Sequence, residues 1–415
     1  MQAIVIGGGI IGLSSALYLQ QSGWQVTVID KDGLLNNCSY GNAGYICPSH
    51  FIPLATPGII RQGLKWMWNP QSPFYIQPRA SWPLIDWGWK FMRSATPEKV
   101  RAAAIPLRDI ALFSQRCYMD WQGIAGFDMA YEHKGLLEYF QTPEKEEHAH
   151  HTCQQANDLG LDAVVLSREE VQAMEPQTKL AINGALYFKC DAHVYPNKVM
   201  GSLIRHLKAL GVQFRTHEEV TGFEKNNGRI SGVKTNRAMY SPDIIVLASG
   251  SWSRELAAGA GLKIPIMPGR GYSITLENSS NKLNYPAVLM EGRVAITPMD
   301  GNKIRFGGTM EITATNQPPR MGRVKGIIDA VKRYLPDYHI PMPQEKEVWF
   351  GFRPCSADGM PYIGRSKSVT NLVVATGHAM VGMSLGAGTG KLVAEIANEL
   401  KPSVDLMPFL PERFQ

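Results

Sequence analysis

The sequence predicts an α/β fold: a discontinuous Rossmann-type dinucleotide-binding domain with a parallel sheet, joined to an α+β substrate domain with a mainly antiparallel sheet. Three observations lead to this prediction. The first thirty residues read strand, glycine turn, helix, strand; buried-strand patterns return near residues 243 and 372; and strands typical of an antiparallel sheet lie between them. Because parallel strands need long connections, we expect the distant buried segments to share one sheet.

Size and composition fit a globular protein of two interlocked domains. The chain has 415 residues, of which 44% are apolar and 19% charged. The net charge of +6 is a mild excess spread along the chain, so nucleic-acid binding is not expected. The six cysteines lie far apart without a CxxC pair, so we expect reduced thiols, no metal site and a cytoplasmic location.

The N-terminal motif carries the strongest local signal. A strand at residues 3–6 leads into Gly7-x-Gly9-x-x-Gly12, which opens a helix, and Asp30 ends the next strand 18 residues after Gly12. The glycines allow a tight turn and close approach of a pyrophosphate, while the helix N-terminus offers N–H groups and a positive dipole. Asp30 is placed to accept hydrogen bonds from ribose hydroxyls.

The rest of the chain returns to this sheet twice. We predict a helix that begins at Pro196, a strand at 212–220, a hairpin at 222–235, buried strands at 243–250 and 372–377, and a last helix at 388–400. Antiparallel strands are expected near 136–139, 184–188, 273–276, 294–297 and 305–308. We therefore assign residues 1–50, 151–262 and 347–415 to the dinucleotide-binding domain, and residues 51–150 and 263–346 to the substrate domain.

An ordered set of motifs extends over nearly the whole chain. The chain resembles the FAD-dependent D-amino-acid oxidase and glycine oxidase (DAO) family, and most of all its branch of bacterial D-amino-acid and D-hydroxyproline dehydrogenases. The motifs are the Gly7–Gly12 turn, Ser39-Tyr-Gly-Asn-Ala-Gly44, Leu247-Ala-Ser-Gly-Ser-Trp252, Gly269-Arg-Gly-Tyr272, Gly351-Phe-Arg-Pro354, Asp358-Gly-x-Pro-x-x-Gly364 and Gly377-His-Ala-Met-Val-Gly382.

The resemblance implies a noncovalently bound FAD. No cysteine or histidine occupies a recognisable attachment position, although Cys355 lies beside the substrate motif. The residues implied to bind FAD are Gly7, Gly9, Ile11, Gly12, Asp30, Lys31, Ser39, Asn42, Ala43, Gly44, Val220, Ser249, Gly250, Gly377, Gly382, Met383 and Ser384.

The resemblance also implies oxidation of a D-amino acid by hydride transfer from the substrate Cα to flavin N5, with D-proline and hydroxy-D-proline as candidates. Arg353 matches the family's carboxylate-binding arginine, whose fork can grip both oxygens. Tyr272 is expected as a second hydroxyl or as a wall of the pocket. His378 and His50 are candidate proton acceptors by residue type alone, and His378 is expected rather to contact flavin through its backbone.

Two other functions stay open at this point. One is a glycine or sarcosine type of amine oxidase that uses oxygen, and the other is a non-catalytic FAD-binding subunit. For the dehydrogenase, electrons are expected to leave to a quinone or a partner redox protein. The substrate side chain and its chirality are not readable from the sequence.

A tryptophan-rich basic stretch has two interpretations. Its rings and cations either contact an anionic membrane on its inner face or a partner, or pack the substrate domain. An apolar run long enough to cross a bilayer is not found, so membrane contact would be peripheral. The stretch contains Trp66, Trp68, Trp82, Trp87 and Trp89 with Arg61, Lys65, Arg79, Lys90 and Arg93.

Overall fold

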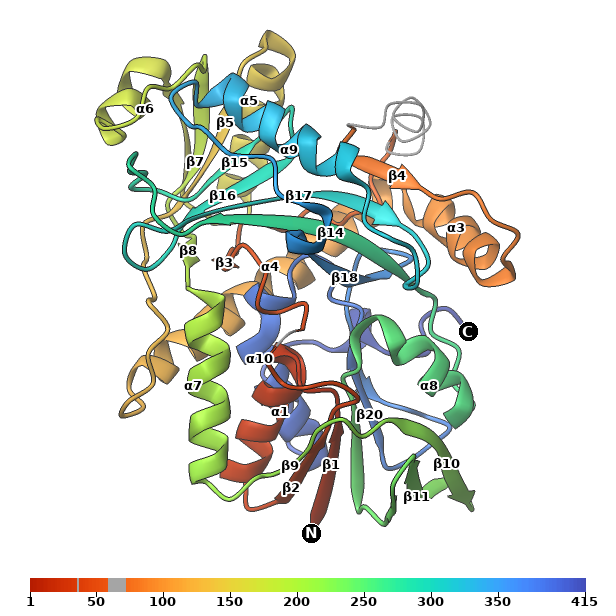
Figure 1. Ribbon diagram of the computed structural model, residues 1–415. Coiled ribbons are helices and arrows are strands. Elements are labelled where there is room, and N and C mark those ends of the chain that lie inside the picture. Colours follow the sequence, from red (N-terminus) through yellow and green to blue (C-terminus); the bar gives the residue numbers. More distant parts are fainter. Residues whose placement is uncertain (36, 59–71) are drawn as a thin grey trace.

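The computed structural model, which describes residues 1–35, 37–58 and 72–415, confirms the α/β fold class (Figure 1). A six-stranded sheet forms the dinucleotide-binding domain, and all of its neighbouring strands are parallel except the pair β19–β20. Segments from both ends and the middle of the chain meet here, as expected. In spatial order the strands are β19 (Tyr362–Arg365), β20 (Leu372–Thr376), β13 (Ile244–Leu247), β1 (Gln2–Ile6), β2 (Gln25–Ile29) and β9 (Gln213–Arg215).

Helices and a small sheet cover the two faces of this sheet. One face packs against α1 (Ile10–Gln21), α7 (Pro196–Ala209), α10 (Gly382–Ala397) and α4 (Pro97–Gln122), which share one apolar core. The other face packs against α8 (Ser253–Ala260) and the hairpin of β10 (Val220–Asn226) and β11 (Arg229–Thr235), which β12 (Met239–Tyr240) extends. The central strands β1, β13 and β20 are therefore buried on both sides, as their apolar runs indicate.

A nine-stranded, mainly antiparallel sheet forms the substrate domain, which lies across one end of the parallel sheet (Figure 1). Its helices are α3 (Trp82–Ser94), α5 (Pro143–Asp158), α6 (Arg168–Met174) and α9 (Met321–Tyr334). Two short strands, β3 (Tyr45–Ile46) and β8 (Ala192–His193), pair separately, and 3-10 turns occur at Gly250–Trp252, Glu345–Glu347 and Met407–Phe409. The order is β18 (Trp349–Ser356), β14 (Ile266–Leu276), β17 (Ile304–Ile312), β16 (Val294–Pro298), β15 (Ala287–Leu289), β5 (Leu136–Phe140), β7 (Gly184–Phe188) and β6 (Ala163–Ser167), with β4 (Phe74–Ile76) on β17.

Several elements lie in a different domain from the one that the sequence boundaries predict. Strands β6 and β7 fall within residues 151–262 and β18 within 347–415, yet all three belong to the nine-stranded sheet. Helix α4 falls within 51–150, yet its buried face belongs to the core of α1 and α10. The boundaries were wrong here because strand pairing across long sequence separations leaves no composition shift in the chain.

Two local predictions also differ from the structure. The strand expected at 212–220 is only β9, three residues long, and β10 begins at Val220. The last helix begins at Gly382 rather than Gly388, because its glycines serve packing rather than a turn.

The glycines inside α10 allow two other helices to approach its backbone. A Cβ atom on Gly390 would stand 2.5 Å from the backbone carbon of Ser14 in α1, and one on Gly388 would stand 2.8 Å from the Cα of Ser114 in α4. Both distances are below van der Waals contact, so the helices can pack this closely only without side chains. This packing brings the N-termini of α1 and α10 to the same end of the parallel sheet (Figure 1).

We expect Gly390→Ala to destabilise the protein by about 1–3 kcal/mol, because the added methyl group forces α10 away from α1. Gly88→Ala in α3 is the matched control, because a Cβ there meets no atom within 4 Å. Alanine has a higher helix propensity than glycine, so this variant should be more stable than the parent by about 1 kcal/mol. Thermal unfolding of the two variants should shift in opposite directions. Equal shifts would contradict the packing role of Gly390.

Candidate active site

A cavity of about 1220 Å³ lies where the two domains meet. Its lining includes the carboxyl ends of the parallel strands β1, β2, β13 and β20, and the facing residues of β14, β16, β17 and β18. Ligands of open α/β sheets bind at such carboxyl ends, because the following helices present their N-termini there. The cavity is thus the candidate active site.

One end of the cavity suits a dinucleotide. The N-cap of α1, Gly9, makes no side-chain capping bond, and the Ile10 N–H donates to Ser39 Oγ at 3.0 Å. A Cβ on Gly7, where φ is +112°, would stand 2.5 Å from the carbonyl oxygen of Ala248, so this turn requires glycine. The cradle of glycines, hydroxyl and helix N-terminus therefore fits a pyrophosphate.

Asp30 lies at the end of β2 and faces this cavity. Its carboxylate accepts hydrogen bonds from the N–H groups of Gly8 at 2.6 Å and Asp32 at 2.8 Å, and burial raises its pKa. The residue thus also orders the glycine turn, a contact that the sequence did not reveal. Val220 lines the same end, beside Glu218, whose carboxylate accepts from Thr235 and Tyr240.

Most of the predicted cofactor residues line the cavity, and three do not. Gly12 packs against the Gly7 carbonyl, Gly377 packs against the Tyr362 ring, and a Cβ on Gly44 would stand 2.1 Å from the Val194 carbonyl oxygen. These glycines hold neighbouring turns close together. The lining residues are Gly7, Gly9, Ile11, Asp30, Lys31, Ser39, Asn42, Ala43, Val220, Ser249, Gly250, Gly382, Met383 and Ser384.

The N-terminus of α10 opens into the middle of the cavity. Its N-cap, Val381, makes no capping bond, so the first N–H groups and the positive dipole face the cavity lining at Gly382 and Met383. His378 precedes this helix, but its Nε2 lies 3.0 Å from Thr389 Oγ1, and burial lowers its pKa to about 3. This placement favours the backbone contact that we expected over an acid–base role.

Arg353 projects into the cavity from β18. It lies against Gly271 of the paired strand β14, where a Cβ would stand 2.1 Å from Nη1. Nη1 donates to the carbonyl oxygen of Thr309, a β-branched residue held at a φ of +67°, which is a costly conformation. Among the described residues no carboxylate is within ion-pair distance of Arg353.

Tyr272 forms a wall of the cavity rather than offering its hydroxyl. The hydroxyl donates to Glu311 Oε2 at 2.8 Å and accepts from the Arg320 N–H at 2.8 Å. Glu311 also forms a buried ion pair with Arg270 at 2.8 Å. The Gly-Arg-Gly-Tyr motif therefore supplies a rigid support for Arg353 and one aromatic surface.

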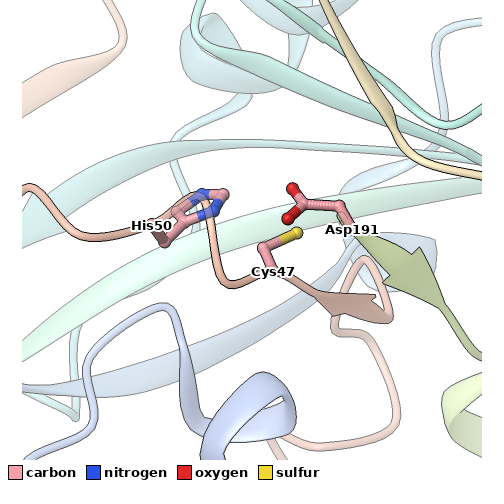
Figure 2. Close-up of side chains that lie close together, drawn as sticks. All are labelled: Cys47, His50 and Asp191. Carbon is pink, nitrogen blue, oxygen red and sulfur yellow. The ribbon is translucent and has the colours of Figure 1, made fainter. Parts of the chain in front are cut away.

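Sequence reasoning missed a polar cluster around the turn that follows β3. The side chains of Cys47, His50 and Asp191 converge, with their nitrogen, sulfur and oxygen atoms within 4.8 Å of one another (Figure 2). Ser49 donates to both carboxylate oxygens of Asp191, from N at 3.1 Å and Oγ at 2.5 Å. Burial and the Asp191 charge raise the pKa of the Cys47 thiol, which favours a hydrogen-bonded cluster over a metal centre.

Glu138 is the second cavity residue that was missed. It lies in the middle of β5, and burial together with the Asp191 charge raises its pKa to about 7. A glutamate inside an otherwise apolar strand is a signal that could have identified it. Asp191 could not have been found this way, since its neighbours in the cluster are more than a hundred residues away.

A family comparison agrees with the motifs. The model of the family described as FAD dependent oxidoreductase matches residues 2–396. A D-amino acid dehydrogenase of Bradyrhizobium diazoefficiens is 30% identical over 100% of this chain and 99% of its own length. A D-amino acid dehydrogenase of Vibrio atlanticus is 31% identical, with 96% of each chain covered.

Solved structures show the same fold. Glycine oxidase from Geobacillus kaustophilus superposes with a TM-score of 0.77 at 22% identity, covering 99% of this chain and 98% of its own. L-proline dehydrogenase from P. horikoshii superposes with a TM-score of 0.74 at 20% identity, covering 100% of this chain and 97% of its own. At these identities the likeness supports the architecture alone.

The raised pKa of Glu138 predicts a pH-dependent stability. The pKa of this carboxyl is about 7 in the folded protein and 4.5 in the unfolded chain. The folded protein therefore binds the proton more tightly, and this adds to the free energy of unfolding below pH 4.5. The added stability is lost as the pH rises from 4.5 to about 7. Relative to wild type, Glu138→Gln should therefore gain up to about 3 kcal/mol across this window and no more above it. Thermal unfolding at several pH values tests this, with exposed Glu146→Gln as control; a difference that does not change with pH would contradict it.

Proposed function

This chain belongs to the FAD-dependent oxidoreductase family, and on that premise we propose that it dehydrogenates a D-amino acid and passes the electrons to a carrier such as a quinone. The observation that carries the proposal is the partly buried Arg353, which has no carboxylate partner among the described residues and faces the cavity beside the N-terminus of α10. The names of the relatives at about 30% identity support the D configuration and the dehydrogenase reaction.

FAD, when bound, supplies the two-electron acceptor for a hydride from the substrate Cα. The Gly7–Gly9 turn, Ser39 and Asp30 fit its diphosphate and ribose, and the open N-terminus of α10 fits the end of the ring system where negative charge develops. We propose noncovalent binding, because Cys355 is buried against Met310 at 3.7 Å and is not part of the cavity lining.

The protein's own residues bind and orient the substrate. The Arg353 fork takes both carboxylate oxygens, which sets the direction of the Cα–H bond. The Tyr272 ring and the glycines of β17, Gly307 and Gly308, form a wall that excludes water. Of the two candidate histidines, His50 is placed to exchange a proton with a ligand, since its ring makes no hydrogen bond within the described part of the chain.

We expect Arg353→Ala to lose about 2–5 kcal/mol of transition-state stabilisation, because a substrate carboxylate would then be buried without its partner. Arg353→Lys keeps the positive charge but loses the planar fork of the guanidinium. This variant should therefore still bind the substrate carboxylate, but it should orient the substrate poorly and reduce the flavin more slowly. Anaerobic reduction of bound flavin by D-amino acids is the measurement, and FAD content should stay near normal. An alanine variant with the parent's rate and half-saturating concentration would show that the carboxylate binds elsewhere.

The two alternative functions are outcomes of the same assay. Hydrogen peroxide formed in step with substrate oxidation would identify an oxygen-using amine oxidase. Reduction of a dye or quinone without peroxide supports the dehydrogenase. If no amino acid in a panel of D and L forms reduces the bound flavin, the result would support the non-catalytic FAD-binding subunit.

We further propose that one face of α3 lies on an anionic membrane surface. Trp82 is 78% exposed, Trp89 57% and Ile85 56%, and they lie on one side of the helix at spacings of three and four residues. Arg93 is exposed in the last turn. Trp87 instead packs in the core and donates to the Cys355 carbonyl, whereas Trp66, Trp68, Arg61 and Lys65 lie outside the described residues.

This contact would be peripheral, since no helix in the described ranges has the length and apolar character to cross a bilayer. An exposed aromatic face with a flanking cation inserts at the headgroup level and is attracted by anionic lipid. A membrane-dissolved quinone would then be within reach of the electron donor.

The docking face predicts salt-sensitive binding to vesicles that contain phosphatidylglycerol, because exposed electrostatic contacts are screened. The double variant Trp82→Ala and Trp89→Ala should lose this binding, and Ile105→Ala, which removes an exposed apolar side chain from α4, should keep it. Cosedimentation measures both. Binding that survives the double variant would assign the contact to another surface.

A further inference from the structure

Glu138 is a partly buried carboxyl that lines the cavity and has no partner in the part of the chain that the structure describes. No hydrogen bond or ion pair reaches it, and it lines the same cavity as Arg353. Strand alternation explains the side to which it points: Leu137 and Tyr139 pack in the core under α9, so Glu138 faces the opposite way. An unpaired carboxyl at such a site costs stability, which suggests that a ligand completes it.

The charges around Glu138 do not neutralise it. The one charge that acts on it is a second carboxyl, Asp191, which Ser49 holds in place. His50 belongs to the same cluster, but burial lowers its pKa to about 4, so it is neutral at physiological pH. The cavity lining also includes the cations Lys31, Lys145, Arg293 and Arg353, and none of them is among the charges acting on Glu138. This end of the cavity therefore favours a cation.

Arg353 and Glu138 lie at opposite ends of one sheet surface. In the order β18, β14, β17, β16, β15 and β5, five strand steps separate them, or about 24 Å between backbones at about 4.8 Å a step, and two long side chains enter this space. The cavity residues of the strands between them include Gly271, Gly307, Ala295 and Val288. The surface thus has an anion-binding end, an uncharged and mostly small middle, and a cation-binding end.

We propose that Glu138, with Asp191 behind it, forms a subsite for a positively charged side-chain terminus, and that the enzyme prefers basic amino acids with long side chains, such as arginine and lysine, over neutral ones. The proposal rests on the proposed function, because it takes Arg353 as the site of the α-carboxylate. A ligand with a carboxylate at one end, methylene groups between and a cation at the other matches the three parts of the surface in order.

The first experiment needs no variant. The holoenzyme is titrated with 6-aminohexanoate and with hexanoate, which share the carboxylate and the chain but differ in the terminal cation, and binding is followed by the flavin spectrum. We expect 6-aminohexanoate to bind at least about tenfold more tightly, the effect of one buried charge contact. Equal binding, or tighter binding of hexanoate, would overturn the proposal.

The second experiment compares anaerobic flavin reduction by D-lysine, D-arginine and the neutral D-norleucine. Glu138→Gln should lower the efficiency with the basic substrates at least about tenfold and change it less than about twofold with D-norleucine. Glu146→Gln, an exposed control on α5, should change neither. A loss that is equal for basic and neutral substrates would assign Glu138 to general structure and overturn the proposal.

Two further outcomes separate this proposal from its premises. If D-norleucine reduces the flavin as well as D-lysine does, the cation subsite fails while the proposed dehydrogenase stands; if no amino acid reduces it, the proposed function itself fails. Treatment with EDTA should leave the preference for basic substrates unchanged. A preference that disappears with EDTA would assign the carboxylates to a metal ion and overturn the proposal.

Discussion

The close approach of α10 to α1 is the constraint on which the rest of the structure depends. Gly390 lies against the backbone of Ser14, and Gly386 lies against the side chain of Ile10. Because α10 has no side chain of its own at these two positions, the helices start side by side at one edge of the parallel sheet. Their open N-termini then face a single cavity.

In the nine-stranded sheet, too, a glycine without a side chain allows a close approach, here of the Arg353 side chain to the neighbouring strand. Gly271 makes room for the Arg353 guanidinium, and the buried Arg270–Glu311 pair with Tyr272 braces the strand that carries this glycine. Arg270 is buried and forms an ion pair with Glu311, so its role is structural, whereas Arg353, on the neighbouring strand, has no carboxylate within ion-pair distance among the described residues. The difference between the two arginines lies in their neighbours across the strands.

The order of the strands in the nine-stranded sheet keeps the positive and the negative side chain of the cavity apart. The unpaired cation belongs to β18 and the unpaired carboxyl to β5, and the intervening strands keep the two from neutralising each other. Each charge costs folding free energy while the cavity holds no ligand, and each gains a partner when a ligand of matching charge binds. On the proposal made above, the sheet would use these two charges to recognise the two ends of one ligand.

The sequence by itself determined the dinucleotide end, because that end is local: the Gly7–Gly12 turn, the α1 helix and Asp30 follow one another within a single βαβ unit. Arg353 stands in a contiguous motif of the sequence, and the structure places it in the lining of the cavity. Tertiary structure alone decided that β6, β7 and β18 join the substrate sheet, that the Tyr272 hydroxyl is taken up by Glu311, and that Glu138 and Asp191 share one end of the cavity. The physical reason is that these contacts form between segments far apart in the chain, where strand pairing and burial, rather than local periodicity, decide which residues meet.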